Sequence, residues 1–344
     1  MEPGKTEQAK VEHATVKEVG HGRYQLGRVI ARESTGTVHE AHDSKANLAV
    51  TVKVLHPTFT RDATKIARFT REAQLLERIQ HPNVARILDL GEDEGGVLYL
   101  AMESLQGRRL HDMLQAGPLP REYGLSIVRQ VVEGVGAAHE QGVLHRGLTP
   151  DSVMVDTDPR DGSARVKLTD FGIAKLAEPG VAGGTVELIT GKPEYMSPEQ
   201  CQGKSADQRA DLYACGCILY LTLTGRLPIT GRNPVDVILA QCDKVPAPPT
   251  RIRPELPEVI DRICVKALAK RPEDRYQSAG ELASDIRQAE RGSSVSPVPS
   301  VDTRRVVAAG GGLRAQDPKW LLVSFALGVA AAALALRFVL DWGP

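Results

Sequence analysis

Residues that can bind phosphate groups or metal ions lie in three short segments of the chain. Lys53 lies in "VTVKVL", Glu72 follows nineteen residues later, and Asp170 lies in "LTDFGIA". A lysine ammonium binds phosphate oxygens as a point charge, and a carboxylate can bind Mg²⁺ or hold a neighbouring lysine in place. These residue types favour a site for a phosphorylated ligand, provided that the fold brings the three segments together.

Short strands and one helix are expected to carry the first two of these residues. The segments "YQLGRVIA" (24–31), "GTVHEAHD" (36–43) and "LAVTVKVL" (48–55) are rich in β-formers and separated by turn residues. Apolar residues at helical spacing predict a helix over 63–80, which ends at His81-Pro82-Asn83. Residues 84–104 predict two strands around an acidic, glycine-containing turn.

Helical patterns dominate after residue 107. Residues 122–142 and 255–270 show clear apolar periodicity. A β-rich region followed by a helical region is the order of an α+β fold.

The composition is that of an ordinary globular protein. The 344 residues are 42% hydrophobic and 25% charged, with a formal net charge of zero, so nucleic acid is not an expected partner. The five cysteines form no CxxC pair, which argues against a zinc site or a disulfide framework and fits a reducing cytosol. We expect them to be small buried side chains.

In their order along the chain, the motifs resemble those of the eukaryotic-type (Hanks-type) serine/threonine protein kinases that are found in bacteria. The resemblance runs from about Tyr24 to Ala289 and rests on "VTVKVL", "HRGLTPDS", "LTDFGIA", "GKPEYMSPEQ", "DLYACGCILYLTLTG" and "RPEDRYQSA". It implies a two-lobed protein kinase fold over 24–290, with a β-rich N-lobe at 24–103 and a helical C-lobe at 104–290.

The resemblance also implies a nucleotide site for ATP with Mg²⁺, in a weakened or absent form. The residues that match the nucleotide-binding positions are Gly36, Val38, Lys53, Glu72, Met102 and Glu103. Asp170 matches the metal-binding position. An alternative is that the Lys53–Glu72 pair and the Asp170 turn only brace the two lobes.

Other matching residues have structural or regulatory roles in the family. His145 and Phe171 are expected to stack with Leu76, Asp211 to hold the loop at 145–152, and Glu199 to pair with Arg275. Arg146 would bind a phosphate on the segment that follows Gly172. The phosphate acceptors there would be Thr185 and Thr190.

The loop that carries catalysis in the family departs from the family's pattern. The family reads HRDLKPEN, and this chain reads "HRGLTPDS". Gly147 stands for the catalytic aspartate and has no side chain to accept a proton, a loss of about 10²–10⁴-fold in rate. Thr149 stands for the lysine that stabilises the transferring phosphate. Ser152 stands for the metal-binding asparagine, and its short neutral oxygen reaches a metal poorly, unless a water bridges the two.

Departures also occur around the rest of the expected pocket. Ala31 and Glu33 replace the first two glycines of the phosphate-binding turn, and a carboxylate at 33 would repel phosphates. Thr51 replaces an alanine that packs on adenine. Lys192 replaces a threonine, so lysine and threonine are exchanged between Lys192 and Thr149. Either Lys192 restores positive charge near the loop or the two positions drifted independently.

These departures predict a pseudokinase that acts in signalling through protein partners, one of which would be an active kinase. The alternative is an active Ser/Thr kinase with a non-standard catalytic loop, because positioning supplies much of the catalysis in phosphoryl transfer.

The C-terminal part predicts a membrane anchor. Residues 320–340 are long and apolar enough to span a bilayer, although a buried helix is an alternative. Basic residues that precede the span predict a single-pass anchor in the inner (cytoplasmic) membrane, with the kinase-like domain in the cytoplasm. Small residues at 324, 328 and 332 suggest a homodimer, although an alanine-rich helix gives this spacing by chance. Residues 291–319 read as a disordered Ser/Pro/Gly linker, and 1–23 as a polar extension.

Overall fold

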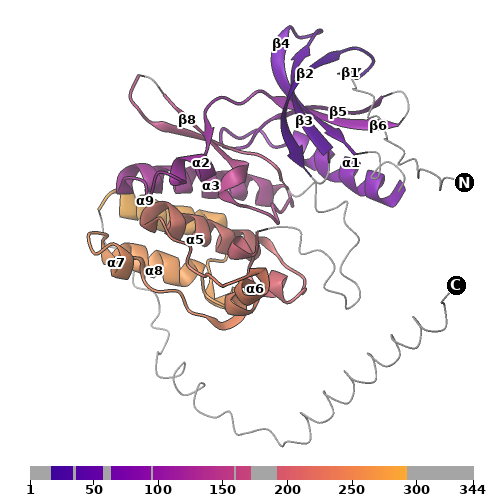
Figure 1. The fold of residues 1–344 in the computed structure, drawn as a ribbon. Helices are drawn as coiled ribbons and strands as arrows, with labels where there is room; N and C mark the ends of the chain where they lie inside the picture. The colour runs from indigo at the N-terminus through magenta and orange to yellow at the C-terminus, as the bar shows by residue number, and fades with distance from the viewer. Residues whose placement is uncertain are drawn as a thin grey trace, which may run out of the picture. The chain divides into compact units, whose positions relative to one another are not determined.

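A computed structural model describes residues 17–33, 36–56, 63–93, 96–158, 160–171 and 192–292, apart from a few side chains, those of Glu33 and Glu72 among them. Within these ranges a β-rich lobe precedes a helical lobe, which confirms the expected two-lobed α+β architecture (Figure 1). The predicted membrane span and nearly all of the predicted linker lie outside the described residues. None of the helices in the described ranges has the length and apolar character needed to cross a membrane.

The first lobe is an antiparallel sheet with the order β1-β2-β3-β4-β6-β5. Its strands are β1 (Glu18–Val19), β2 (Tyr24–Glu33), β3 (Gly36–Asp43), β4 (Leu48–Leu55), β5 (Ile87–Asp93) and β6 (Val97–Glu103). The three strands expected between residues 24 and 55 form within two residues of their predicted ends. The two strands expected within 84–104 also form.

The alternation of side chains along β4 determines which way Lys53 faces. Val50, Val52 and Val54 point to one side of the sheet, where they join a small apolar cluster with Tyr24 and Tyr99. Lys53 therefore faces the opposite side, toward the second lobe.

Helix α1 (Ala63–Glu77) covers this lobe where it meets the second lobe (Figure 1). Phe69, Ala73 and Leu76 are buried, as the apolar spacing predicts. They belong to the main core, which continues without interruption into the second lobe. The helix ends three residues before the predicted boundary.

The second lobe is built mainly from helices. They are α2 (Leu110–Leu114), α3 (Arg121–Glu140), α4 (Pro198–Cys201), α5 (Gln208–Thr224), α6 (Pro234–Asp243), α7 (Pro249–Ile252), α8 (Glu258–Ala267) and α9 (Ala279–Glu290). Short 3₁₀ turns lie at η1 (Pro150–Ser152), η3 (Pro193–Tyr195) and η4 (Pro272–Asp274).

Helix α5 is the centre of this lobe, and it is buried on nearly all sides. The side chain of Asp207 accepts a hydrogen bond from the backbone N–H of Arg209 and caps its first turn. Gly225 ends the helix with φ of 69°, a left-handed conformation that glycine adopts without steric cost. Cys215 and Cys217 of this helix are buried, as expected, and burial raises the pKa of both thiols. Cys264 is also buried, whereas Cys201 and Cys242 are partly exposed, contrary to the expectation for all five.

A small second sheet was not expected from the sequence. Its strands β7 (Arg108–Arg109), β8 (Val153–Thr157) and β9 (Ala164–Leu168) pair in the order β7-β8-β9. Each strand has five residues or fewer, too short for a clear period-two pattern. This sheet lies under the gap between the lobes, so it forms the floor of the site described next.

Candidate functional site

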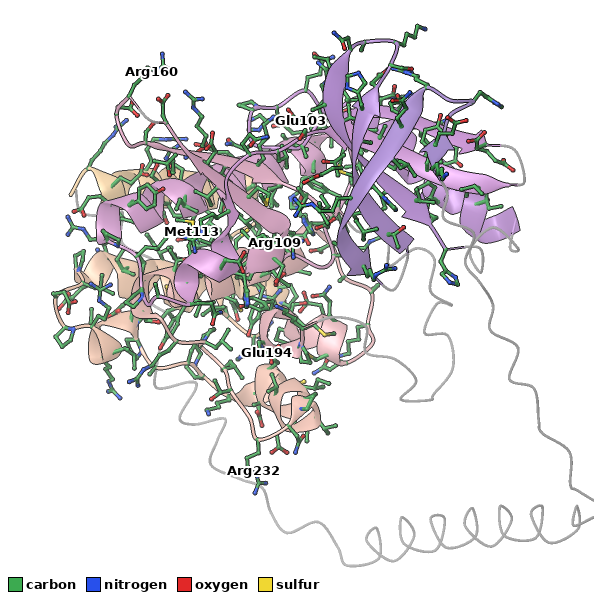
Figure 2. All side chains as sticks on the ribbon, turned by 45° about the horizontal axis from the view of Figure 1, so that its top comes forward. Glu103, Arg109, Met113, Arg160, Glu194 and Arg232 are labelled. Atoms are coloured by element: carbon green, nitrogen blue, oxygen red, sulfur yellow. The ribbon has the colours of Figure 1, made fainter. Side chains whose placement is uncertain are left out.

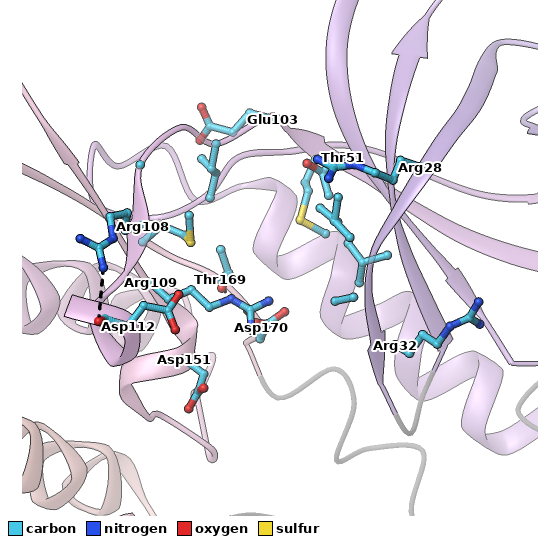
Figure 3. A pocket seen from close by; sticks show the side chains of 17 residues that line it. Arg28, Arg32, Thr51, Glu103, Arg108, Arg109, Asp112, Asp151, Thr169 and Asp170 are labelled. Carbon is cyan, nitrogen blue, oxygen red and sulfur yellow. Dashed lines mark hydrogen bonds between the residues drawn. The ribbon is translucent and has the colours of Figure 1, made fainter. Parts of the chain in front are cut away.

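A cavity of about 830 Å³ lies between the lobes (Figure 3). Strands β2, β3 and β4 supply its roof through residues such as Val38 and Thr51. The segment that joins the lobes supplies Met102 and Glu103, and the small sheet supplies the floor through Met154. A narrow recess of about 40 Å³ adjoins it and is lined by Lys53 and Phe171, among others. The recess and the cavity share Met102, Thr169 and Asp170.

Lys53 lies where the resemblance predicts it. Its side chain is only 6% exposed, and its backbone pairs with that of Val38 on β3. Glu72 lies in α1, but its side chain is outside the described residues, so the predicted ion pair between the two stays a prediction.

Gly36 has a reason to be glycine that does not depend on a nucleotide. A Cβ atom at this position would collide with the carbonyl oxygen of Val54 on the neighbouring strand β4. The close approach of two backbones therefore requires the glycine. Of the two lost glycine positions, Ala31 lines the cavity and the side chain of Glu33 is not described.

The connection between the lobes is held in place by Glu103. Its carboxylate accepts a hydrogen bond from Lys167 Nζ at 2.6 Å and another from the backbone N–H of Arg86 at 2.8 Å. Met102 pairs with Thr51 across β6 and β4, and both line the cavity. The backbone of this segment is thus rigidly positioned at the back of the cavity.

The loop at 145–152 is anchored by Asp211 of α5, as expected. Backbone N–H groups of His145 and Arg146 each donate to its carboxylate at 2.8 Å. His139 Nε2 lies 2.9 Å from the same carboxylate, whose residue is 3% exposed. Arg146 has φ of 59°, so the loop turns sharply just after its anchor.

The predicted apolar column between the lobes also forms. The rings of His145 and Phe171 lie 4.7 Å apart, and Phe171 lines the recess together with Leu76. Burial lowers the pKa of His145, which favours the neutral ring. Its Nε2 lies 3.0 Å from the carbonyl oxygen of Thr169. The loop and the start of the next segment are thereby tied together.

The hydroxyl groups of Thr149 and Ser152 are used within the loop. Ser152 Oγ donates to the carbonyl oxygen of Thr149 at 2.9 Å and accepts from its N–H at 3.3 Å. Thr149 Oγ1 accepts from the N–H of Asp151 and donates to its carboxylate. These bonds cap η1, and Ser152 is 3% exposed. Ser152 is therefore turned into the loop and not toward a metal.

Lys192 reaches the same loop. Its Nζ lies 2.5 Å from the carboxylate of Asp151. Burial alone would raise the pKa of Asp151, but the hydrogen bond and the charge of Lys192 more than offset this and lower it. The predicted positive charge is present beside the loop, and a carboxylate neutralises it.

Asp170 is exposed, has φ of 55°, and accepts a hydrogen bond from Thr169 Oγ1 at 3.0 Å. Within the described ranges, no three His, Cys, Asp or Glu residues are grouped to hold a metal ion. One carboxylate beside an unavailable Ser152 does not fit a pair of magnesium ions. The roof, the connecting segment and Lys53 still fit a nucleotide.

The ion pair predicted between Glu199 and Arg275 forms in the second lobe. The guanidinium donates to both carboxylate oxygens, at 2.8 Å and 2.7 Å, and Arg275 is 2% exposed. Burial acts to raise the pKa of Glu199, but the hydrogen bonds and the positive charge of Arg275 outweigh burial, so the pKa is lowered overall. This pair supports the fold and does not line the cavity.

Some candidate residues lie outside the described part of the chain. They are Gly172, Thr185 and Thr190, together with the side chain of Glu72. Conversely, the sequence reasoning did not select Arg109, Asp112 or Asp151, which line the cavity. Only their location along the chain could have indicated that these residues line the cavity. The segment "GRR" directly follows the connection between the lobes, and Asp151 lies within the altered loop.

Comparison with known proteins agrees with this geometry. The protein kinase domain family matches residues 24–285. The chain is 35% identical over 268 residues to the serine/threonine-protein kinase PknB of Mycobacterium leprae, covering 77% of this chain and 42% of that protein. It is 37% identical over 275 residues to the serine/threonine-protein kinase pkn3 of Myxococcus xanthus, covering 78% and 50%.

Among solved structures, the fold is similar to the kinase domain of Mycobacterium tuberculosis PknI. The TM-score is 0.61 at 27% identity, with 78% of this chain and 96% of that chain covered. A two-lobed fold with a cavity between the lobes and an anchored loop beneath it defines the class of protein kinase-like proteins. The chain belongs to the protein kinase domain family. It spans about half or less of the length of these two curated relatives.

Proposed function

We propose that the chain is a kinase-like signalling protein that binds a nucleotide between its lobes and has impaired or absent phosphoryl transfer. The observation that carries the proposal is the state of the loop at 145–152. Gly147 offers no proton acceptor, and the hydroxyls of Thr149 and Ser152 are bonded within the loop. The remaining carboxylate there, Asp151, is engaged by Lys192.

The second candidate is an active Ser/Thr kinase that transfers the ATP γ-phosphate to protein. Its support is that relatives at 35–37% identity are named serine/threonine-protein kinases. Buried Lys53, the ordered connecting segment and Asp170 also favour it. This candidate requires a proton acceptor other than residue 147.

A restoration experiment separates the two candidates. The full-length protein in detergent is incubated with labelled ATP, magnesium and a generic protein substrate, beside its Lys53→Met variant. We expect both to give the same background. Replacing Gly147 by Asp, Thr149 by Lys, Ser152 by Asn and Lys192 by Thr together is expected to raise transfer at least about a hundredfold, since a positioned base contributes about 10²–10⁴-fold.

The matched control carries the same changes with Asn at position 147. Asn has the shape of Asp without a basic oxygen, so this control should lose most of the gain. Wild-type transfer clearly above that of Lys53→Met would favour the active kinase. A fully restored loop with no gain would contradict the reasoning that this loop limits transfer.

We further propose that the protein is anchored to the inner membrane by residues 320–340, with the kinase-like domain in the cytoplasm. Protein partners, including an active kinase that phosphorylates Thr185 or Thr190, would then meet it at the membrane. Arg146 would bind the added phosphate. Incubation with an active membrane kinase and labelled ATP tests this, and a lack of label in residues 173–195 would count against it.

Dimer formation through the anchor is a related proposal. Small residues four positions apart allow two helices to pack closely in a membrane. Crosslinking in membranes is expected to give a dimer that is lost when Gly328 is replaced by Leu. Crosslinking that yields only monomer would remove this part of the proposal.

A further inference from the structure

Arg109 is a cationic residue of the cavity that sequence reasoning did not identify. It lies on β7, where its backbone pairs with Met154 of β8. Cross-strand partners lie on the same face of a sheet, and Met154 lines the cavity floor. The register therefore places Arg109 on the cavity side. Figure 3 shows its exposed side chain extending beneath the connection between the lobes, toward Asp170.

Other arginines of the cavity are less suited to bind a ligand there. Arg28 is paired with Glu40 at 2.6 Å, and Arg108 donates to the carbonyl oxygen of Asp112. The guanidinium of Arg32 points away from the cavity in Figure 3. Among the residues that the structure describes, Arg109 makes no hydrogen bond or ion pair, even with its neighbour Asp112. Its guanidinium, with five N–H donors, is therefore available to a ligand in the cavity.

The carboxylates around the cavity make this charge significant. A nucleotide beneath the roof would bring its phosphates toward Asp170, and like charges repel in a partly desolvated site. A divalent cation normally removes this repulsion, but Ser152 is turned into its own loop. Lys192, which reaches the loop at 145–152, is bound to Asp151. Lys53 lines the recess together with Asp170, and Arg109 is a further positive group placed on the cavity side to offset that carboxylate.

Guanidinium groups suit this task. The planar fork of arginine donates two parallel hydrogen bonds to phosphate oxygens, and it stays charged at any physiological pH. We propose that Arg109 binds the phosphates of a nucleoside di- or triphosphate in this cavity and that binding therefore needs no divalent cation. The inference rests on the proposed nucleotide binding and adds its ligand contact and its independence of metal.

The test compares ADP with adenosine, because only ADP carries phosphates. Binding of each to the full-length protein in detergent is measured by calorimetry, in EDTA and in magnesium. For the wild type, we expect ADP affinities in the two buffers within about threefold, a difference of less than 1 kcal/mol. In EDTA, Arg109→Leu is expected to weaken ADP roughly 10- to 100-fold, since hydrogen bonds to charged groups contribute about 1.5–3 kcal/mol.

Adenosine binding shows whether the cavity of the Arg109→Leu variant is still folded. Arg109→Leu should change the adenosine affinity by less than about twofold, because adenosine has no phosphate for the guanidinium to bind. Arg232→Leu is the matched control. Arg232 is exposed beside α6 and lies far from the labelled Arg109 in Figure 2. Its loss should leave both affinities unchanged.

Asp170→Asn distinguishes a site in which Arg109 replaces the metal from a site that requires a metal, because it changes the ADP affinity in opposite directions. If Arg109 replaces the metal, removing the carboxylate removes a repulsion, so ADP in EDTA should bind severalfold more tightly. If a metal is required, the same change should abolish ADP binding in magnesium. ADP binding that is seen only in magnesium and is lost in Asp170→Asn would overturn this inference and leave the proposed nucleotide binding intact.

Two other outcomes also count against it. Equal losses of ADP and adenosine in Arg109→Leu would show that Arg109 supports the fold and does not bind phosphates. If neither ADP nor adenosine binds the wild type in either buffer, both this inference and the proposed nucleotide binding fail.

Discussion

Replacing Asp211 by Asn should strongly destabilise the second lobe. Asp211 is 3% exposed and receives three hydrogen bonds, from the N–H groups of His145 and Arg146 at 2.8 Å and from His139 at 2.9 Å. Asn has one acceptor oxygen, so its NH₂ group must face at least one of these donors. Each hydrogen bond to a charged group contributes about 1.5–3 kcal/mol.

We therefore expect Asp211→Asn to lower the free energy of unfolding by about 2–4 kcal/mol, which is one or two lost bonds. For a domain of this size, about 2–4 °C of Tm accompany each kcal/mol, so Tm should fall by about 4–16 °C. Urea titration monitored by far-UV circular dichroism gives the free energy of unfolding, and calorimetry gives Tm.

Asp236→Asn is the control for a general effect of losing an aspartate. Asp236 pairs with Arg232, whose side chain is 93% exposed, so the pair contributes little and the change should cost less than about 1 kcal/mol. If Asp211→Asn cost no more than Asp236→Asn, Asp211 would not be the anchor of the loop, and the reasoning would be refuted.

Three further predictions concern stability in other parts of the domain. The Arg23 hydrogen bonds hold the pKa of Asp43 at about 2, below its unfolded value of about 3.9, so its contribution is complete above pH 4 and is lost as pH falls toward 2. Asp43→Asn should flatten the pH dependence of stability in that window, and an unchanged acid titration would contradict this. Gly36→Ala should lower stability by about 1–3 kcal/mol in urea titration, because its Cβ would overlap the Val54 carbonyl oxygen; a neutral result would mean that β3 can shift. Lys192→Thr should cost less than about 1 kcal/mol, since this ion pair is partly exposed, and a larger loss would show a more insulated pair.

The sequence was sufficient to predict most of the first lobe. Alternation along residues 48–55 predicts a strand, and the burial of Val50, Val52 and Val54 on one face follows from it. The pairs of Asp211 with the loop and of Glu199 with Arg275 were also predictable. Both were expected from the resemblance of their motifs to those of the protein kinase family, and the residue types alone did not identify the partners.

The remainder of the site depends on contacts between distant segments. Arg109 gains its place from pairing with Met154, forty-five positions later, and a two-residue strand leaves no pattern in the sequence. The sequence shows that the oxygen of Ser152 is short, but the bonds to Thr149 appear only with the fold. Likewise, nothing in the sequence near Lys192 indicates that Asp151 is its partner.

The anchoring of the loop at 145–152 by Asp211 determines which substitutions the loop can accept, both in evolution and in engineering. Asp211 binds backbone N–H groups, which every residue except proline possesses. The anchor is therefore indifferent to the side chains that follow, including the one at Gly147. Such a loop can exchange its chemical groups by mutation without being displaced, so transfer activity and folding can be lost or regained separately.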